Sequence, residues 1–202
     1  MRYPIILLDN GHGKETTGKR SPDGRLLEWK WTREIARSLR DDLQDRGYNV
    51  FLVCPEDIDV PLSIRAKRVN AYCTQYGKKN VLLISIHINA SGNTMEWREP
   101  SGWTAYTTVG LTSSDDLARC LYDAAESELE DRMIRKYNHD KEPDFEENFY
   151  ILRNTSCATV LTENFFMDNN QDAEFLQSET GKKTVVRVHI KGILKYIKQF
   201  YQ

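Results

Sequence analysis

The 202-residue sequence predicts one α/β domain, residues 1–202, with a mostly parallel central sheet of about six strands and helices on both faces. Short apolar runs, which are typical of buried strands, alternate with longer segments whose apolar residues recur at helical spacing. This alternation favours a parallel sheet that helices cover on both sides. The sequence contains no internal repeat, low-complexity segment or linker, and a chain of this length can bury one sizeable core.

The first half of the chain is predicted to contain three strands and two helices. Residues 3–9, YPIILLD, form the first strand. Residues 28–46 form a helix, because isoleucine and leucine recur on one face and Gly47 is a stop signal. We then expect a strand at 48–53, a helix that Pro61 opens and that runs to about Tyr76, and a strand at 80–90.

The second half is predicted to add three strands and two helices. Residues 102–109, after a polar loop, form a strand that could lie at an edge of the sheet. Ser113 and Asp116 have the spacing of a capping box, which starts a helix that runs to about Met133. An acidic, irregular stretch follows at 136–148. The remaining elements are strands at 149–153 and 157–166 and a C-terminal helix with Val186, Ile190, Ile193 and Ile197 on one face.

The composition excludes several partners. A net charge of −2 is unlike the strongly basic charge of most nucleic-acid-binding domains. No apolar run approaches the roughly 20 residues of a transmembrane helix, so we expect no integral membrane segment. The first ten residues are too short for the apolar region of a signal peptide and run directly into the His12 loop, so we expect no signal peptide in the given chain. The four cysteines are scattered, with no closely spaced pair, and are expected to be small buried side chains with free thiols.

Polar residues follow or end several predicted strands. His12, between two glycines, follows the first strand, His87 lies late in the third, and Glu163 ends the last. Glu28 opens the first helix, after a loop long enough to fold back over the same edge. In open α/β sheets, ligands bind beyond the carboxyl ends of the strands. We therefore expect these four side chains to meet at one edge of the sheet.

Two imidazoles and one carboxylate are a common catalytic zinc set. His12, Glu28 and His87 are the candidate ligands of one zinc ion, and the flanking glycines are expected to let the backbone turn so that His12 faces the metal. Glu163 is then free to act as a base on metal-activated water. Taken singly, each residue also has an ordinary structural interpretation, such as a turn histidine or a helix-terminal charge. The other histidines, His139 and His189, lack such partners and are expected to be structural or exposed.

Four ordered motifs resemble those of the zinc-dependent N-acetylmuramoyl-L-alanine amidases, the peptidoglycan hydrolases that include cell-separation amidases and phage lysins. The motifs are LDNGHG…GRLLEWK, LLISIHINAS, SGWTAYTT and FYILRNTSCATVLTENFFMDN, and the resemblance extends from about Ile5 to the C-terminal helix. It implies that His12, Glu28 and His87 hold zinc and that Glu163 is catalytic. The implied reaction is hydrolysis of the amide between N-acetylmuramic acid and L-Ala of the stem peptide, with Glu163 as general base and acid.

The sequence also gives expectations about substrate binding, access to the site, the substrate and the place of action. Asn89 lies two positions beyond His87 and is a candidate for substrate binding, the alternative being a strand-end hydrogen bond. Some family members carry a helix that plugs the zinc site, but the stretch at 134–148 is short and we expect an accessible cleft. The implied substrate is peptidoglycan or a muropeptide; a stem-peptide peptidase and an inactive wall-binding module are the alternatives. The implied place of action is the cell wall or periplasm, reached after removal of a leader or by lysin-type release from the cytoplasm.

Overall fold

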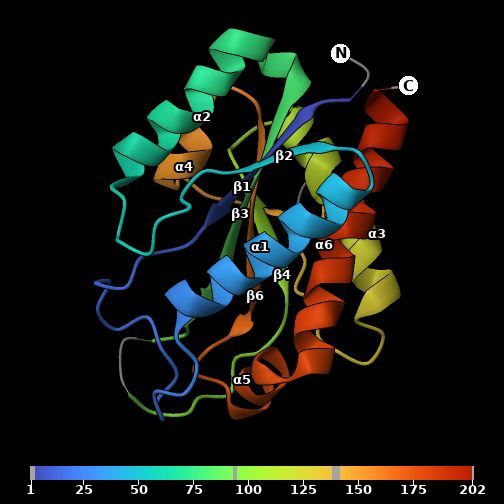
Figure 1. The fold of residues 1–202 in the computed structure, drawn as a ribbon. Coiled ribbons are helices and arrows are strands. Elements are labelled where there is room, and N and C mark those ends of the chain that lie inside the picture. Colours follow the sequence, from blue (N-terminus) through green and yellow to red (C-terminus); the bar gives the residue numbers. More distant parts are fainter. Residues whose placement is uncertain (1–2, 93–94, 138–141, 202) are drawn as a thin grey trace.

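The computed structural model describes residues 3–92, 95–137 and 142–201, and these form one sheet with helices on both faces (Figure 1). The strand order is β2-β1-β3-β6-β4-β5. Every neighbouring pair is parallel except β4 with β6, so the predicted α/β class is confirmed. The strands are β1 (Ile5–Asn10), β2 (Asn49–Leu52), β3 (Val81–Asn89), β4 (Thr104–Thr107), β5 (Phe145–Glu146) and β6 (Ala158–Phe166).

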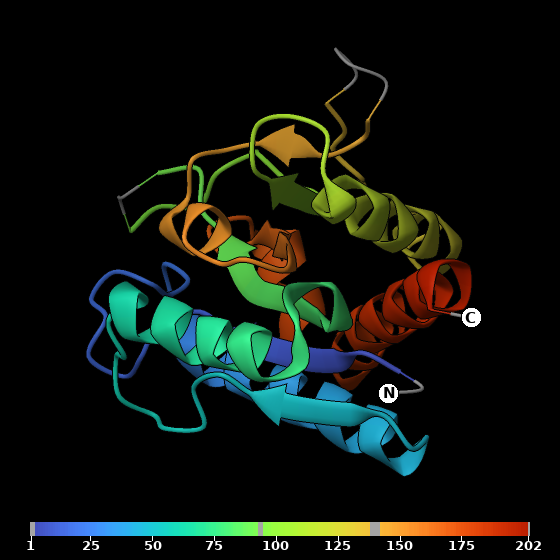
Figure 2. The same ribbon diagram turned by 90° about the horizontal axis from the view of Figure 1, so that it is seen from above.

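Two layers of helices enclose this sheet. The helices are α1 (Glu28–Asp45), α2 (Leu62–Tyr76), α3 (Ser113–Glu128), α4 (Tyr150–Arg153), α5 (Asn170–Gln177) and α6 (Glu179–Phe200), with a 3-10 turn at Lys78–Asn80. Figure 2 shows α2 and α4 on one side of the sheet and α3 and α6 on the other. Side chains of β1 alternate between the two cores: Ile6 and Leu8 pack with α1, α3 and α6, and Ile5 and Leu7 with α2 and α4. Burial on both sides explains why the strand is apolar throughout.

The predicted strand at 149–153 is wrong, because these residues form the short helix α4. Ile151 and Leu152 are consecutive and both pack into the core under α2, whereas a strand would send them to opposite faces. The carbonyl of Ile151 also accepts a hydrogen bond from the Thr155 hydroxyl. Periodicity cannot distinguish so short an apolar run from a helical turn.

The sixth strand comes instead from the stretch that was predicted to be irregular. Phe145 and Glu146 form β5 beside Tyr106 and Thr107 of β4, so β5 and not β4 lies at the edge of the sheet. Two residues are too few to produce a detectable alternation of apolar and polar side chains.

The start of α3 is displaced by one residue from the predicted capping box. Thr112, not Ser113, is the N-cap, and its backbone N–H donates to Asp115 at 2.7 Å. The helix ends at Glu128, five residues before the predicted Met133, and the chain then turns so that Ile134 can bridge to Trp103. The separate helix α5, which Asn169 caps, was not predicted.

All four cysteines are free, as predicted: Cys54, Cys73 and Cys120 are buried and Cys157 is partly exposed. Within the described ranges, no helix has the length and apolar character needed to cross a membrane.

Candidate active site

His12 leaves the end of β1 in a left-handed conformation, with a φ of 61°. Such a φ is uncommon for a residue with a side chain. The sequence suggested that the glycines would make this turn, but neither Gly11 nor Gly13 has a positive φ. Their role is steric: a Cβ on Gly11 would lie 2.5 Å from His87 Nδ1, and one on Gly13 would lie 2.1 Å from the backbone nitrogen of Asp59. The motif therefore allows the histidine turn to pack against β3 and against the loop between β2 and α2.

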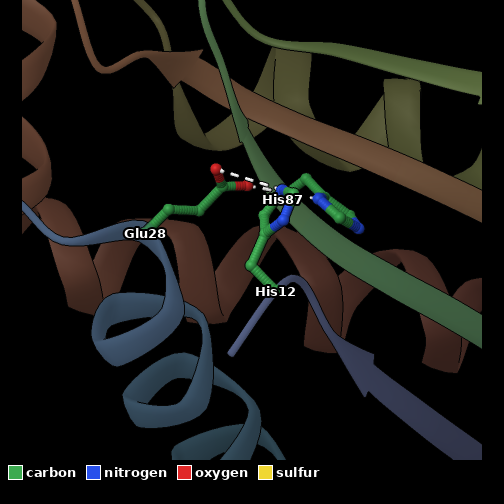
Figure 3. Close-up of side chains that lie close together, drawn as sticks. All are labelled: His12, Glu28 and His87. Carbon is green, nitrogen blue, oxygen red and sulfur yellow. Dashed lines mark hydrogen bonds and ion pairs between the residues drawn. The ribbon is translucent and has the colours of Figure 1, made fainter. Parts of the chain in front are cut away.

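Glu28 is the first residue of α1, and its buried carboxylate points toward the two imidazoles (Figure 3). Its Oε1 lies 3.2 Å from His87 Nδ1 and accepts a hydrogen bond of 2.9 Å from the backbone N–H of Ile88. Its Oε2 lies 3.4 Å from His12 Nε2. The two imidazole rings are edge to face, with their centroids 5.2 Å apart. The structure thus brings the three predicted ligands together.

The electrostatics of this group keep one histidine neutral and favour the charged forms of the other two residues. Burial lowers the pKa of His12 to about 4, and the negative charge of Glu28 offsets only part of that effect. Burial alone would lower the pKa of His87, but its hydrogen bond and charge interaction with Glu28 raise it. Burial would likewise raise the pKa of Glu28, yet the two histidines and the Ile88 N–H lower it.

This donor set fits a zinc ion. One ligand atom from each of His12, Glu28 and His87 lies within 4.8 Å of the other two. Glu28 Oε2 is buried and accepts no hydrogen bond from the described residues, with His12 Nε2 at 3.4 Å, which suits an atom that binds a cation. Zinc in catalytic sites takes three such protein ligands and keeps another position open.

Glu163 lies on the strand beside His87. The two residues are register partners in the parallel pair β3–β6, so their side chains share one face of the sheet. Burial is the main reason that the pKa of Glu163 is raised to about 8, and the negative charge of Glu28 adds to it. Its Oε2 is buried and has no partner among the described residues. A carboxyl group in this state can carry a proton near neutral pH.

A bulge in β6 comes directly after Glu163. Ile88 of β3 faces both Asn164 and Phe165, and Phe165 adopts a φ of 65°. The Asn164 side chain fills the irregularity: its amide donates to the carbonyl of His87 at 2.9 Å, and its oxygen accepts from Trp103 Nε1 at 3.0 Å. The Asn164 side chain therefore helps to hold His87 and the adjacent Glu163 in position.

Glu163 and the three candidate ligands line one cleft of about 570 Å³. Asn89 lines it too, as expected for a residue two positions beyond His87, although its own Oδ1 accepts a hydrogen bond from Ala90 N. Sequence reasoning missed Lys19, Arg65 and the partly exposed aromatic pair Phe149 and Tyr150, which also line the cleft. Lys19 lies in a loop, Arg65 and Tyr150 lie on helices, and Phe149 directly precedes α4. None of them follows a predicted strand, so the search for polar residues at strand ends did not find them.

The described residues of the stretch before α4 leave this cleft accessible. Glu142 pairs with Arg119, Glu146 accepts a hydrogen bond from Gly110 N, and neither residue lines the cleft. His189 is buried on α6, where it contacts the Thr162 hydroxyl and the Val185 carbonyl, in agreement with a structural role. His139 lies outside the described residues.

Comparison with known proteins gives consistent results. A family described as N-acetylmuramoyl-L-alanine amidase matches residues 6–195. An N-acetylmuramoyl-L-alanine amidase of Bacillus licheniformis is 29% identical over 192 residues, which are 94% of this chain and 67% of the relative. The endolysin of Bacillus phage SPP1 is 28% identical over 198 residues, 96% of this chain and 66% of the endolysin. An amidase of Neisseria meningitidis is 26% identical over 97% of this chain, which spans 53% of that relative.

The fold is shared with solved amidase structures. The crystal structure of an N-acetylmuramoyl-L-alanine amidase from Clostridium difficile 630 superposes with a TM-score of 0.81 at 22% identity, covering 98% of both chains. A Nostoc punctiforme amidase superposes with a TM-score of 0.79, also at 22% identity, and covers 98% of both chains. At this level of identity the superpositions establish a common fold.

Proposed function

Because the chain belongs to the N-acetylmuramoyl-L-alanine amidase family, we propose that it is a zinc-dependent hydrolase of peptidoglycan. The bond it cleaves joins the lactyl group of N-acetylmuramic acid to the L-alanine of the stem peptide. The observation that carries this proposal is the convergence of His12, Glu28 and His87 at one point, in a cleft that also contains Glu163.

Zinc is the cofactor that suits these ligands. His12 and His87 offer imidazole nitrogens, and Glu28 offers a carboxylate whose orientation the Ile88 N–H fixes. When bound, the ion supplies a Lewis acid that acidifies water and polarises the scissile carbonyl. The protein contributes the open side of the cleft, where the substrate amide can approach the ligands.

Glu163 carries the proton transfers in this mechanism. Its carboxylate accepts the proton of the attacking water and then delivers it to the nitrogen of the leaving L-alanine. The carbon–oxygen bond forms first and the carbon–nitrogen bond breaks after the nitrogen is protonated, which leaves a lactyl carboxylate on the sugar and a free amine on the peptide. Burial raises the pKa of Glu163, which makes its carboxylate a stronger base for the first transfer.

The proposed place of action follows from the substrate. Peptidoglycan lies in the cell wall or periplasm, and the relatives include a Bacillus phage endolysin and proteins named as probable cell wall amidases of Staphylococcus aureus. We therefore propose that the chain works on the wall or on muropeptides released from it.

Mass spectrometry of digested peptidoglycan tests this function. An amidase releases intact stem peptides with a free N-terminal alanine, whereas a stem-peptide peptidase leaves alanine on the sugar. The E163Q variant should retain zinc and lose at least about a hundredfold in kcat. E99Q, which removes an exposed carboxylate outside the cleft, is the matched control. Peptides that lack the first alanine would refute the amidase, and a normal rate in E163Q would remove Glu163 from the mechanism.

A further inference from the structure

We propose that Lys19 forms a subsite for a carboxylate of the stem peptide, next to the bond that is cleaved. This inference deepens the proposed amidase function and rests on it. It concerns recognition of the leaving peptide, to which no residue has so far been assigned.

The backbone around Lys19 is held in place. Lys19 lies in the loop between β1 and α1, and its carbonyl accepts a hydrogen bond of 3.1 Å from the backbone N–H of Glu28. The next residue, Arg20, forms an antiparallel bridge with Leu27. The loop is thus closed onto the start of α1, and Lys19 has a fixed position relative to the candidate metal ligand Glu28.

The side chain of Lys19 lines the same cleft as His12 and Glu163. Its charge acts on both: burial is the main reason for the low pKa of His12, and Lys19 lowers it further. Burial raises the pKa of Glu163, and Lys19 opposes that increase. Lys19 therefore lines the cleft that holds the reacting centre, and its charge acts on two residues of that centre.

Lys19 has a charge available for a ligand. Across the described residues, no carboxylate forms an ion pair with it. Arg65, the other cation that lines the cleft, is instead fully engaged: it pairs with Asp9 at 2.8 Å and donates to the carbonyls of Asn10 and His12. Lys19 is also partly buried, so an anion in the cleft would meet an ammonium group that is incompletely solvated.

The stem peptide supplies anions of the required kind. Its second residue carries a carboxylate close to the scissile amide, and its third residue carries another in many walls. The aromatic and aliphatic side chains on the α2 and α4 side of the cleft, Phe149, Tyr150 and Leu62, offer no positive charge. Beyond the candidate metal site, Lys19 is therefore the available cationic side chain for a peptide carboxylate among the described residues that line the cleft.

The test compares substrates and variants together. Muramoyl tripeptides are prepared in two matched pairs, in which the carboxylate of the second or of the third residue is replaced by a carboxamide. The K19Q variant should lose roughly tenfold in kcat/KM on the acid member of one pair and less than twofold on its amide. K19R should retain discrimination between acid and amide. K14Q removes an exposed lysine of the same loop that does not line the cleft and is the matched control.

The outcomes separate this inference from the amidase assignment. A selective loss in the pair that differs at the second residue, or at the third, supports the subsite and identifies the carboxylate. An equal loss on acid and amide in both pairs, or no loss, overturns the subsite while wild-type cleavage still supports the amidase. Absence of cleavage of every muramoyl tripeptide by the zinc-loaded wild-type protein would instead refute the function on which the inference rests.

Discussion

Arg65 of α2 donates a hydrogen bond of 3.0 Å from Nη2 to the backbone carbonyl of His12. Its Nη1 donates to the carbonyl of Asn10 at 2.6 Å and to Asp9 Oδ1 at 2.8 Å. The guanidinium group is almost fully buried, and these acceptors compensate for its desolvation. Arg65 therefore holds the turn in which His12 adopts its left-handed conformation, and we expect it to act as a positioning residue for a metal ligand.

Replacing Arg65 by methionine should weaken zinc binding by roughly ten- to a hundredfold, because the His12 turn loses its donors. The variant should also lose about 3–5 kcal/mol of stability, since Asp9 is left buried without its cation. Competition with a chelating indicator measures the affinity, and urea unfolding of the metal-free protein measures the stability.

R68M is the control for this experiment. Arg68 lies on the same helix and pairs with Glu56, but this ion pair is more than one-third exposed and should contribute at most about 1 kcal/mol. Its zinc affinity should equal that of the wild type. Unchanged zinc affinity in a folded R65M variant would limit Arg65 to a structural role in the core.

Gly11 should be intolerant of a side chain for a different reason. A Cβ at this position would lie 2.5 Å from His87 Nδ1 and 2.6 Å from its Cε1, so the imidazole ring must move in the G11A variant. We expect zinc affinity to fall at least about tenfold with the charges of all ligands unchanged. Cobalt substitution provides the measurement, because its visible spectrum reports the geometry of the ligands.

The T17A variant, which changes an exposed residue of the same loop, should leave the cobalt spectrum unaltered. A wild-type spectrum and affinity in G11A would show that the ring can adjust at no cost, contrary to this expectation.

Three of the four candidate site residues, His12, His87 and Glu163, could be located because strand ends can be recognised from apolar runs, whereas Glu28 was located as the residue that opens the first helix. His12 and His87 follow or end such runs, and parallel strands bring their carboxyl ends to one edge. The conformation of the His12 turn was not predictable, since glycine is the residue expected at a positive φ. Arg65 was not found either: on an amphipathic helix it looks like any surface arginine, and only the packing of α2 against β1 reveals its acceptors.

In the fold, too, long elements could be predicted from the sequence and short elements could not. The buried strands β1, β3 and β6 are six to nine residues long and rich in apolar residues, and they were located within two residues. The short elements β5 and α4 contain two and four residues, and what determines them is the neighbour that they pack against. Tertiary contacts thus decided the identity of the sixth strand.

The pH dependence of zinc binding follows from His87. Its hydrogen bond with Glu28 raises its pKa above the ordinary value of 6.5, so in the metal-free protein it gains a proton as the pH falls through that higher value. Protonation of His87 stabilises the metal-free fold at pH values below 6.5, and this contribution is lost as the pH rises through the pKa of the folded state. The proton also competes with zinc, because an imidazolium cannot bind the metal. His12, with a pKa of about 4, is already neutral in this range.

Zinc should therefore stabilise the protein most at pH 8 and progressively less towards pH 6. The difference in Tm between the zinc-loaded and the chelator-treated protein, measured by calorimetry at fixed free zinc, gives this contribution. Because the proton that stabilises the metal-free form is the same one that competes with zinc, the difference must shrink as the pH falls. A difference that stays constant over this range would show that His87 releases no proton when zinc binds, and a larger difference at pH 6 would contradict its assignment as a ligand.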